Sequence, residues 1–177
     1  MTTSVKEIAE GMKHRFPMLI PELKDTKVSS QSYWVGVSEA QLSLNPDAPE
    51  EAVCQLSAVV AVRSEVVVSG FAGAAYYDFK DERGNIIYAL LGDGMGVNGT
   101  GVFGKDSRKE KQVKNVPIEV AAKTYSVSAF PCRVDEPGFD DIKHRVDEFA
   151  KTLEGMKESL KSIGASAKEI IGALKGG

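Results

Sequence analysis

The chain has 177 residues, of which 42% are hydrophobic and 27% charged, enough for one domain with its own core. Its formal net charge of −3 argues against the strongly basic surface that nucleic acids and anionic membranes require. The sequence shows neither an apolar run long enough to span a bilayer nor the apolar core of a secretory signal. We therefore expect a cytoplasmic protein.

The first predicted element is a short amphipathic helix near the N-terminus. Ser4 and Glu7 have the spacing of a capping box, in which each side chain satisfies a free backbone N–H of the first turn. Pro17 and Pro21 end the helix and enclose a short apolar connector. One helical face is apolar and consists of Val5, Ile8, Ala9, Met12 and Phe16.

Residues 28–130 are predicted to be rich in β-strands. From Cys54 to Val68 the even positions are mostly apolar and several odd positions are polar, as in strands with one buried face. The stretch 71–91 has two apolar runs around a charged turn, which predicts a β-hairpin.

Alternating apolar residues at 116–122 and 125–129 predict a last antiparallel pair of strands, joined around Lys123. Since no long helical pattern separates the predicted strands, a parallel sheet is disfavoured. The predicted fold class is therefore α+β, with an antiparallel β-barrel or a strongly curled sheet. A sandwich of two sheets is the remaining antiparallel arrangement.

The stretch 92–107 carries six glycines in its first thirteen positions and nearly matches two phosphate-binding motifs. The run from Gly94 to Gly99 fits G-x-G-x-x-G, but no helical pattern follows it. The second run fits a Walker A motif except at Asp106, where the motif needs a hydroxyl group for magnesium. We interpret the glycines as positions at which bent strands lack a Cβ.

Residues 136–177 are predicted to be a helical segment that follows a β-rich domain at 1–135. From Phe139 to Leu174 the apolar residues alternate in spacings of three and four, a heptad pattern. A helix break is expected near Gly164. The flanking positions are weakly charged, which favours packing on a broad apolar surface, either the protein's own sheet or another subunit. The predicted helix interface consists of Phe149, Leu153, Met156, Leu160 and Ile163.

Aromatic residues gather in the predicted β-rich region. Most of them are expected in the core, but a few at the mouth of a barrel would line an apolar pocket with hydroxyl groups. The candidate ligand pocket consists of Tyr33, Trp34, Tyr76, Tyr88 and Phe103.

The sequence contains no local pattern of catalytic or metal-binding residues. His14 and His144 lie on polar helical faces without a second ligand at metal spacing, so we expect no cofactor and no metal. Cys54 and Cys132 are interpreted as buried free thiols, with a disulfide as the alternative. The charged run 105–114 is interpreted as a solvated loop, because its charges are mixed in sign.

These features favour a non-enzymatic β-domain that self-associates or binds a protein partner. The first alternative is a β-barrel that binds a small molecule or lipid, and the second is a nucleotide-binding enzyme that uses residues 92–106. We expect a homo-oligomer or a protein partner, and no nucleic acid. Membrane contact through the C-terminal helix, at Ile170, Ile171 and Leu174, is a minor alternative.

Overall fold

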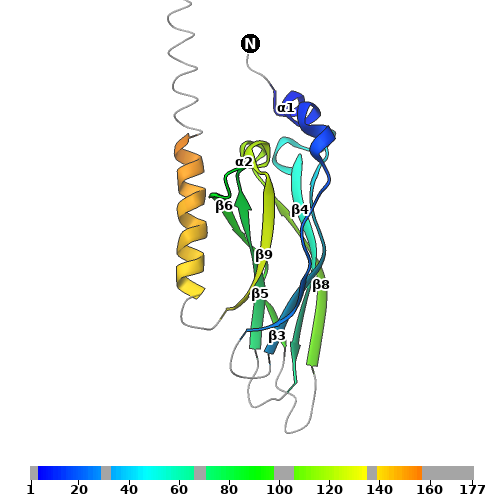
Figure 1. The fold of residues 1–177 in the computed structure, drawn as a ribbon, viewed down its shortest axis with the longest axis vertical. Helices are drawn as coiled ribbons and strands as arrows, with labels where there is room; N and C mark the ends of the chain where they lie inside the picture. The colour runs from blue at the N-terminus through cyan, green and yellow to red at the C-terminus, as the bar shows by residue number, and fades with distance from the viewer. Residues whose placement is uncertain (1–3, 29–32, 66–70, 98–105, 135–138, 157–177) are drawn as a thin grey trace, which may run out of the picture.

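The fold of this protein was analysed in a computed structural model that describes residues 4–28, 33–65, 71–97, 106–134 and 139–156. It is an α+β fold in which two antiparallel sheets face each other (Figure 1). Short helices lie at one end of the sheets, and a longer helix lies along the outer side of one sheet (Figure 1).

The N-terminal helix α1, Val5–Met12, forms as predicted. The Glu7 backbone N–H donates to Ser4 Oγ at 3.2 Å, and the Ser4 N–H donates to Glu7 Oε2 at 2.7 Å, which is the capping box. Its apolar face buries Ala9 and Met12. A 3-10 turn, η1 (Lys13–Arg15), ends the helix before Pro17.

The first sheet has five strands. They are β1 (Met18–Leu19), β2 (Leu23–Lys27), β3 (Tyr33–Leu44), β4 (Cys54–Ser64) and β8 (Asp106–Asn115). β3 and β4 are central, with β8 at the β4 edge and both β1 and β2 against β3. A 3-10 turn, η2 (Glu50–Ala52), precedes β4. Burial alternates strictly along β4, as its sequence predicts.

The second sheet is built around β5 (Phe71–Lys80). β6 (Ile86–Leu91) and β7 (Met95–Val97) pair with different parts of β5, and β9 (Ser126–Arg133) also pairs with it. The predicted hairpin at 71–91 is confirmed, because β5 and β6 are antiparallel with Tyr77 opposite Leu90.

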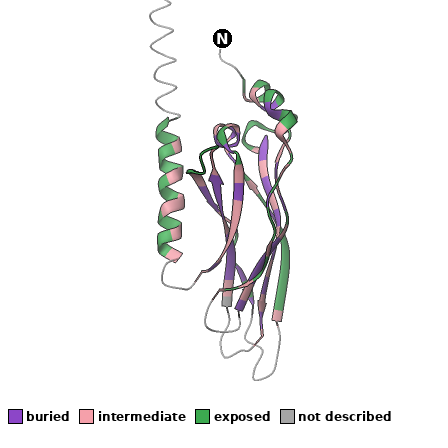
Figure 2. Cartoon of the chain, viewed as in Figure 1, coloured by how far each residue is buried: buried purple, intermediate pink, exposed green. Residues whose placement is uncertain are grey.

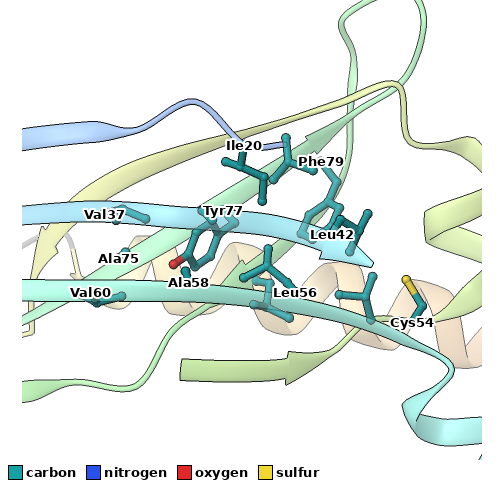
Figure 3. Packing of buried hydrophobic residues seen from close by; sticks show 14 of the residues in the cluster. Ile20, Val37, Leu42, Cys54, Leu56, Ala58, Val60, Ala75, Tyr77 and Phe79 are labelled. Atoms are coloured by element: carbon teal, nitrogen blue, oxygen red, sulfur yellow. The ribbon is translucent and has the colours of Figure 1, made fainter. Parts of the chain in front are cut away.

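The hydrophobic core fills the space between the two sheets (Figures 2 and 3). Leu42 and Leu56 of the first sheet meet Tyr77 and Phe79 of the second there (Figure 3). The strand pairings of the described residues form two separate sheets and do not close into a barrel. An antiparallel architecture is therefore confirmed, in the form of facing sheets.

The strand predicted at 116–122 is wrong, because Ile118–Lys123 forms the helix α2. Val120 and Ala121, which are consecutive residues of this helix, are both buried. In a half-buried strand, consecutive side chains point to opposite faces, so one of the two would be exposed. Pro117 precedes the helix and has no N–H for a strand ladder. The second predicted strand of the pair is present as β9.

The loop predicted at 105–114 is also wrong over most of its length, because Asp106–Asn115 is the strand β8. Ten residues pair with β4, from Ser64 opposite Asp106 to Gln55 opposite Asn115. The strand is charged because it lies at a sheet edge, where charges oppose pairing with another chain.

Residues 139–156 form the C-terminal helix, and its half-buried residues are Phe139, Ile142, Arg145, Val146, Phe149 and Leu153. Five of these six follow the predicted heptad. The break predicted near Gly164 lies outside the described residues. None of the helices that the structure describes is long and apolar enough to cross a membrane.

Candidate functional site

The outer face of the second sheet is covered, although it lies away from the core. Ala74, Ala89 and Cys132 are buried there without belonging to the core cluster between the sheets. The helix at 139–156 runs beside this sheet (Figure 1). The helix contacts this face through Arg145, which lies over the Tyr76 ring.

An aromatic pair lies in the middle of this outer face. Tyr76 of β5 is opposite Phe130 of β9, and their rings stack with centroids 5.1 Å apart and an angle of 19° between their planes. The guanidinium carbon of Arg145, from the helix, lies 5.7 Å from the centroid of the Tyr76 ring. This distance is within the range of a cation–π interaction.

Asp78 is the most deeply buried carboxylate described on this face. It lies two residues after Tyr76 on β5, and only 4% of it is exposed. Its Oδ1 atom has no hydrogen-bond partner. Lys80 belongs to the same row of β5 and donates from Nζ to Ser128 Oγ at 3.3 Å. A buried carboxylate oxygen without a donor is costly, so it marks a place where a donor would bind favourably.

The titration of the two β5 residues reflects the same environment. Burial raises the pKa of Asp78, while the charges of Arg145 and Lys80 act in the opposite direction. Burial also raises the pKa of Tyr76, assisted by the charge of Asp78, whereas the charge of Arg145 and a side-chain hydrogen bond from it lower that pKa. The aromatic rings and the buried carboxylate are suited to binding a cation, and the guanidinium of Arg145 is the cation that lies beside them.

The predicted helix interface is distributed along this contact. Phe149 and Leu153 are half-buried, but Met156 is 44% exposed at the end of the described helix. Leu160 and Ile163 lie outside the described residues.

The aromatic residues of the predicted ligand pocket do not lie together. Tyr33 is buried between the sheets with the guanidinium of Arg133 over its ring, whereas its neighbour Trp34 points to the opposite side of β3. Tyr76 is on the outer face of the second sheet, and Tyr88 contacts Phe79 edge to face in the core. Phe103 lies outside the described residues.

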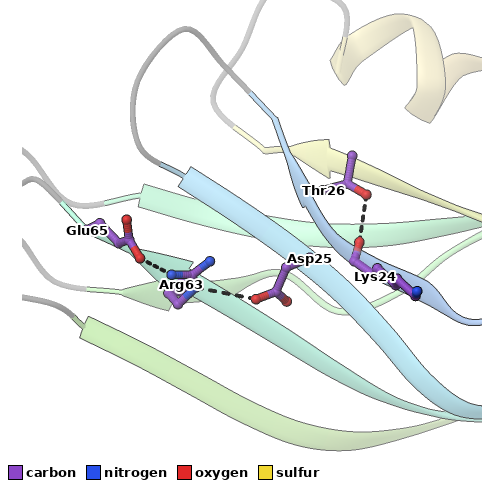
Figure 4. Close-up of polar contacts among 5 residues, drawn as sticks. All are labelled: Lys24, Asp25, Thr26, Arg63 and Glu65. Atoms are coloured by element: carbon purple, nitrogen blue, oxygen red, sulfur yellow. Dashed lines mark hydrogen bonds and ion pairs between the residues drawn. The ribbon is translucent and has the colours of Figure 1, made fainter.

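Trp34 belongs instead to a polar surface on the outer side of the first sheet. The guanidinium carbon of Arg63 lies 4.4 Å from the Trp34 ring centroid, and its Nε lies 3.4 Å from Asp25 Oδ2. Arg63 also pairs with Glu65, and Thr26 donates to the Lys24 carbonyl nearby (Figure 4). These charges satisfy one another, so the surface has a structural explanation.

Tyr88 lines a cavity of about 520 Å³ at the helical end of the two sheets. The described lining contains three carboxylates and no basic residue: Val5, Glu50, Glu51, Tyr88, Asn115, Val116, Pro117, Ile118 and Glu119. The sequence shows the paired carboxylates at 50–51, but only the fold brings them to Tyr88.

The thiols and imidazoles do not form a catalytic group within the part of the chain that is described. Both cysteines are free, and burial raises the pKa of Cys54 to about 12 and that of Cys132 to about 11, so little thiolate forms at neutral pH. His14 is exposed in η1, and His144 is paired at 3.7 Å with Glu148 on the helix surface. The described residues contain no cluster of metal-binding side chains.

No protein-family model, curated protein or solved structure matches this chain.

Proposed function

We propose that this protein is a partner-binding module that self-associates through its C-terminal helical segment. The observation that carries the proposal is Met156, which continues the apolar stripe of Phe149 and Leu153 yet is 44% exposed. An apolar stripe that continues into solvent requires another surface to cover it.

The dimensions of the sheet support a cover from outside the chain. Residues 139–156 make a helix about 27 Å long at 1.5 Å per residue. β5 has 10 residues, or about 33 Å at 3.3 Å per residue. The described helix already extends to the level of α2 (Figure 1). The heptad in the sequence continues past the described helix to Leu174, and a helix over the whole heptad would be about 54 Å long at 1.5 Å per residue, which is longer than β5.

Light scattering of the full chain tests this proposal. We expect an oligomer that becomes a monomer when residues 157–177 are deleted, with the sheet signal in circular dichroism unchanged. Leu160→Glu should have the same effect, and Ser162→Glu, which adds the same charge on the opposite side of the heptad, should not. A full chain that is monomeric at every concentration would remove the proposal.

A second candidate function, the binding of a small cationic molecule, is favoured by the cavity at Tyr88. A volume of about 520 Å³ lies in the usual range of ligand sites, and its carboxylates and aromatic ring suit an organic ammonium ion. The second candidate function includes the predicted barrel, in which the two sheets would close around the ligand. Native mass spectrometry with tetramethylammonium and benzylammonium tests it, and binding should weaken in Tyr88→Ala but not in Tyr125→Ala.

A cytoplasmic location is part of the main proposal. It is supported by the two free cysteines, since thiols stay reduced in the cytosol.

A further inference from the structure

The outer face of the second sheet, at Tyr76, Asp78 and Phe130, is occupied by Arg145 of the chain's own helix. We propose that this face is a recognition site for a guanidinium group, and that its ligand is an arginine-bearing helical segment that replaces the helix at 139–156.

Asp78 supplies the charge of this site. Only 4% of Asp78 is exposed, and its Oδ1 atom lacks a donor. The residues opposite Asp78 on the neighbouring strands are Ala89 and Ser128. Neither an alanine nor a serine hydroxyl neutralises a carboxylate, and Lys80, the cation of the same row, donates to Ser128 Oγ and leaves Asp78 Oδ1 without a donor. A cationic donor from outside the sheet would do so.

The stacked rings of Tyr76 and Phe130 supply the platform. The guanidinium carbon of Arg145 lies 5.7 Å from the Tyr76 ring centroid. A guanidinium has five N–H donors in one plane, so it can stack on a ring, reach a hydroxyl and still offer donors to a carboxylate. An ammonium group is more strongly hydrated and lacks the planar fork, which makes it the weaker ligand here.

The present occupant is held loosely. No residue in the range 139–156 is fully buried, and the helix shows only exposed and half-buried residues (Figure 2). A cavity of about 640 Å³ runs along it, with a described lining of Arg145, Glu148, Phe149, Lys151 and Thr152. A helix with so few buried contacts separates from the sheet at a low cost in free energy. A competing segment can therefore take its place.

A helical ligand follows from what the face already holds. The covering element is an amphipathic helix, and the Arg145 side chain is the part of it that reaches Tyr76. This site lies at Arg145, whereas the proposed self-association rests on Met156 at the end of the described helix. The proposed self-association and the guanidinium site can therefore succeed or fail independently.

Chemical rescue of Arg145→Ala in the full chain tests the site. Removing the guanidinium should raise amide hydrogen exchange in residues 142–153 about tenfold and leave β5 protected. Ethylguanidinium at millimolar concentration should restore much of this protection, while ethylammonium should not. Lys143→Ala, on the exposed side of the same helix, should show neither effect.

Two further arms identify the recognising group and the source of the ligand. Adding Asp78→Asn to Arg145→Ala should abolish the rescue. A labelled peptide of residues 139–156 should bind the Arg145→Ala protein by fluorescence anisotropy, and the same peptide with Arg145→Gln should bind at least tenfold more weakly. If the peptide binds but ethylguanidinium does not restore protection, the site recognises arginine only within a helix. If the peptide binds and ethylguanidinium also restores protection, the site accepts small guanidinium compounds as well.

The proposal is overturned if neither ligand has an effect, or if ethylammonium works as well as ethylguanidinium. It is also overturned if rescue persists after Asp78→Asn. Light scattering measures the association of chains, whereas the difference between ethylguanidinium and ethylammonium measures recognition of a guanidinium group, so the two results are distinct.

Discussion

Gln112 joins the two sheets by exchanging a pair of hydrogen bonds with the backbone of Asp93. Its Nε2 donates to the Asp93 carbonyl at 2.9 Å, and its Oε1 accepts from the Asp93 N–H at 3.0 Å. The amide thus replaces a strand backbone between β8 and the segment before β7. The contact needs Gly92, because a Cβ there would lie 2.7 Å from Gln112 Oε1 and 2.9 Å from the Ala75 carbonyl oxygen.

Gln112→Leu is expected to lower the free energy of unfolding by about 1–3 kcal/mol. Leucine keeps much of the volume but leaves both Asp93 backbone groups without a partner. Urea unfolding measures the change, and Lys111→Ala, on the exposed side of the same strand, should change it by less than about 0.5 kcal/mol. Equal effects of the two substitutions would contradict this role of Gln112.

Arg15→Lys is expected to destabilise the helical end of the protein by about 1–3 kcal/mol. Arg15 donates from one nitrogen to the Ala122 carbonyl at 2.9 Å and from the other to the Thr124 carbonyl at 2.5 Å, at the end of α2. Lysine retains the charge but cannot fork. Thermal unfolding should give a lower melting temperature for Arg15→Lys than for Lys13→Ala, which removes an exposed cation of the same turn. An unchanged melting temperature in Arg15→Lys would show that the charge alone is sufficient.

Leu153→Ala is expected to cost about 1–2 kcal/mol, less than the 2–5 kcal/mol of a fully buried leucine, because its side chain is only half-buried. Met156→Ala should cost less than about 0.5 kcal/mol within the monomer, given its 44% exposure. Denaturant unfolding of the chain lacking 157–177 compares them without self-association. A neutral Leu153→Ala would mean that the helix does not pack on the sheet.

Asp78→Asn is expected to change how stability depends on pH. Because burial raises the folded-state pKa of Asp78, the folded protein binds this proton more tightly than the unfolded chain. The contribution of Asp78 is then greatest below its unfolded pKa and falls as the pH rises through the folded value. The free energy of unfolding of the wild type, minus that of Asp78→Asn, should therefore decrease from acid to neutral pH. Urea unfolding at a series of pH values measures this difference.

Asp81→Asn provides a control of opposite sign for this experiment. Hydrogen bonds from Asn85 lower the pKa of Asp81, so its contribution appears above the unfolded pKa and is lost on acidification. If the difference in free energy of unfolding between wild type and Asp78→Asn does not vary with pH, a raised pKa of Asp78 is not the cause of the effect.

The elements that follow one clear period could be predicted from the sequence. Burial along Cys54–Ser64 alternates more strictly than the sequence, in which Val59 and Ala61 are apolar at half-buried positions. Ser4 and Glu7 mark the start of α1. Ile118–Lys123 could not be assigned, because four alternating apolar residues fit a short helix and a strand equally well. Strand β8 has no apolar alternation, since most of its residues are exposed at the sheet edge.

The candidate site was largely hidden from the sequence. The sequence shows Tyr76 as an aromatic residue of the β-rich region, but Asp78 and Arg145 are 67 positions apart and neither belongs to a motif. Only the register of β5 against β9 and the position of the helix bring them together. Tyr33 and Trp34 show the reverse case, since neighbours on a strand point to opposite faces and cannot share a pocket.

The central claim is that the helix at 139–156 covers the outer face of the second sheet, and thiol labelling tests it most directly. Cys132 lies on that face and is 6% exposed, whereas Cys54 is buried in the core between the sheets and serves as an internal reference. Cys54 should react slowly with a thiol reagent in the intact protein, and Cys132 should react more slowly than a thiol of the unfolded chain. Phe149→Asp should accelerate labelling of Cys132 alone, while Lys151→Asp, on the exposed side of the helix, should not. Fast labelling of Cys132 in the unaltered protein, or no response to Phe149→Asp, would contradict the claim.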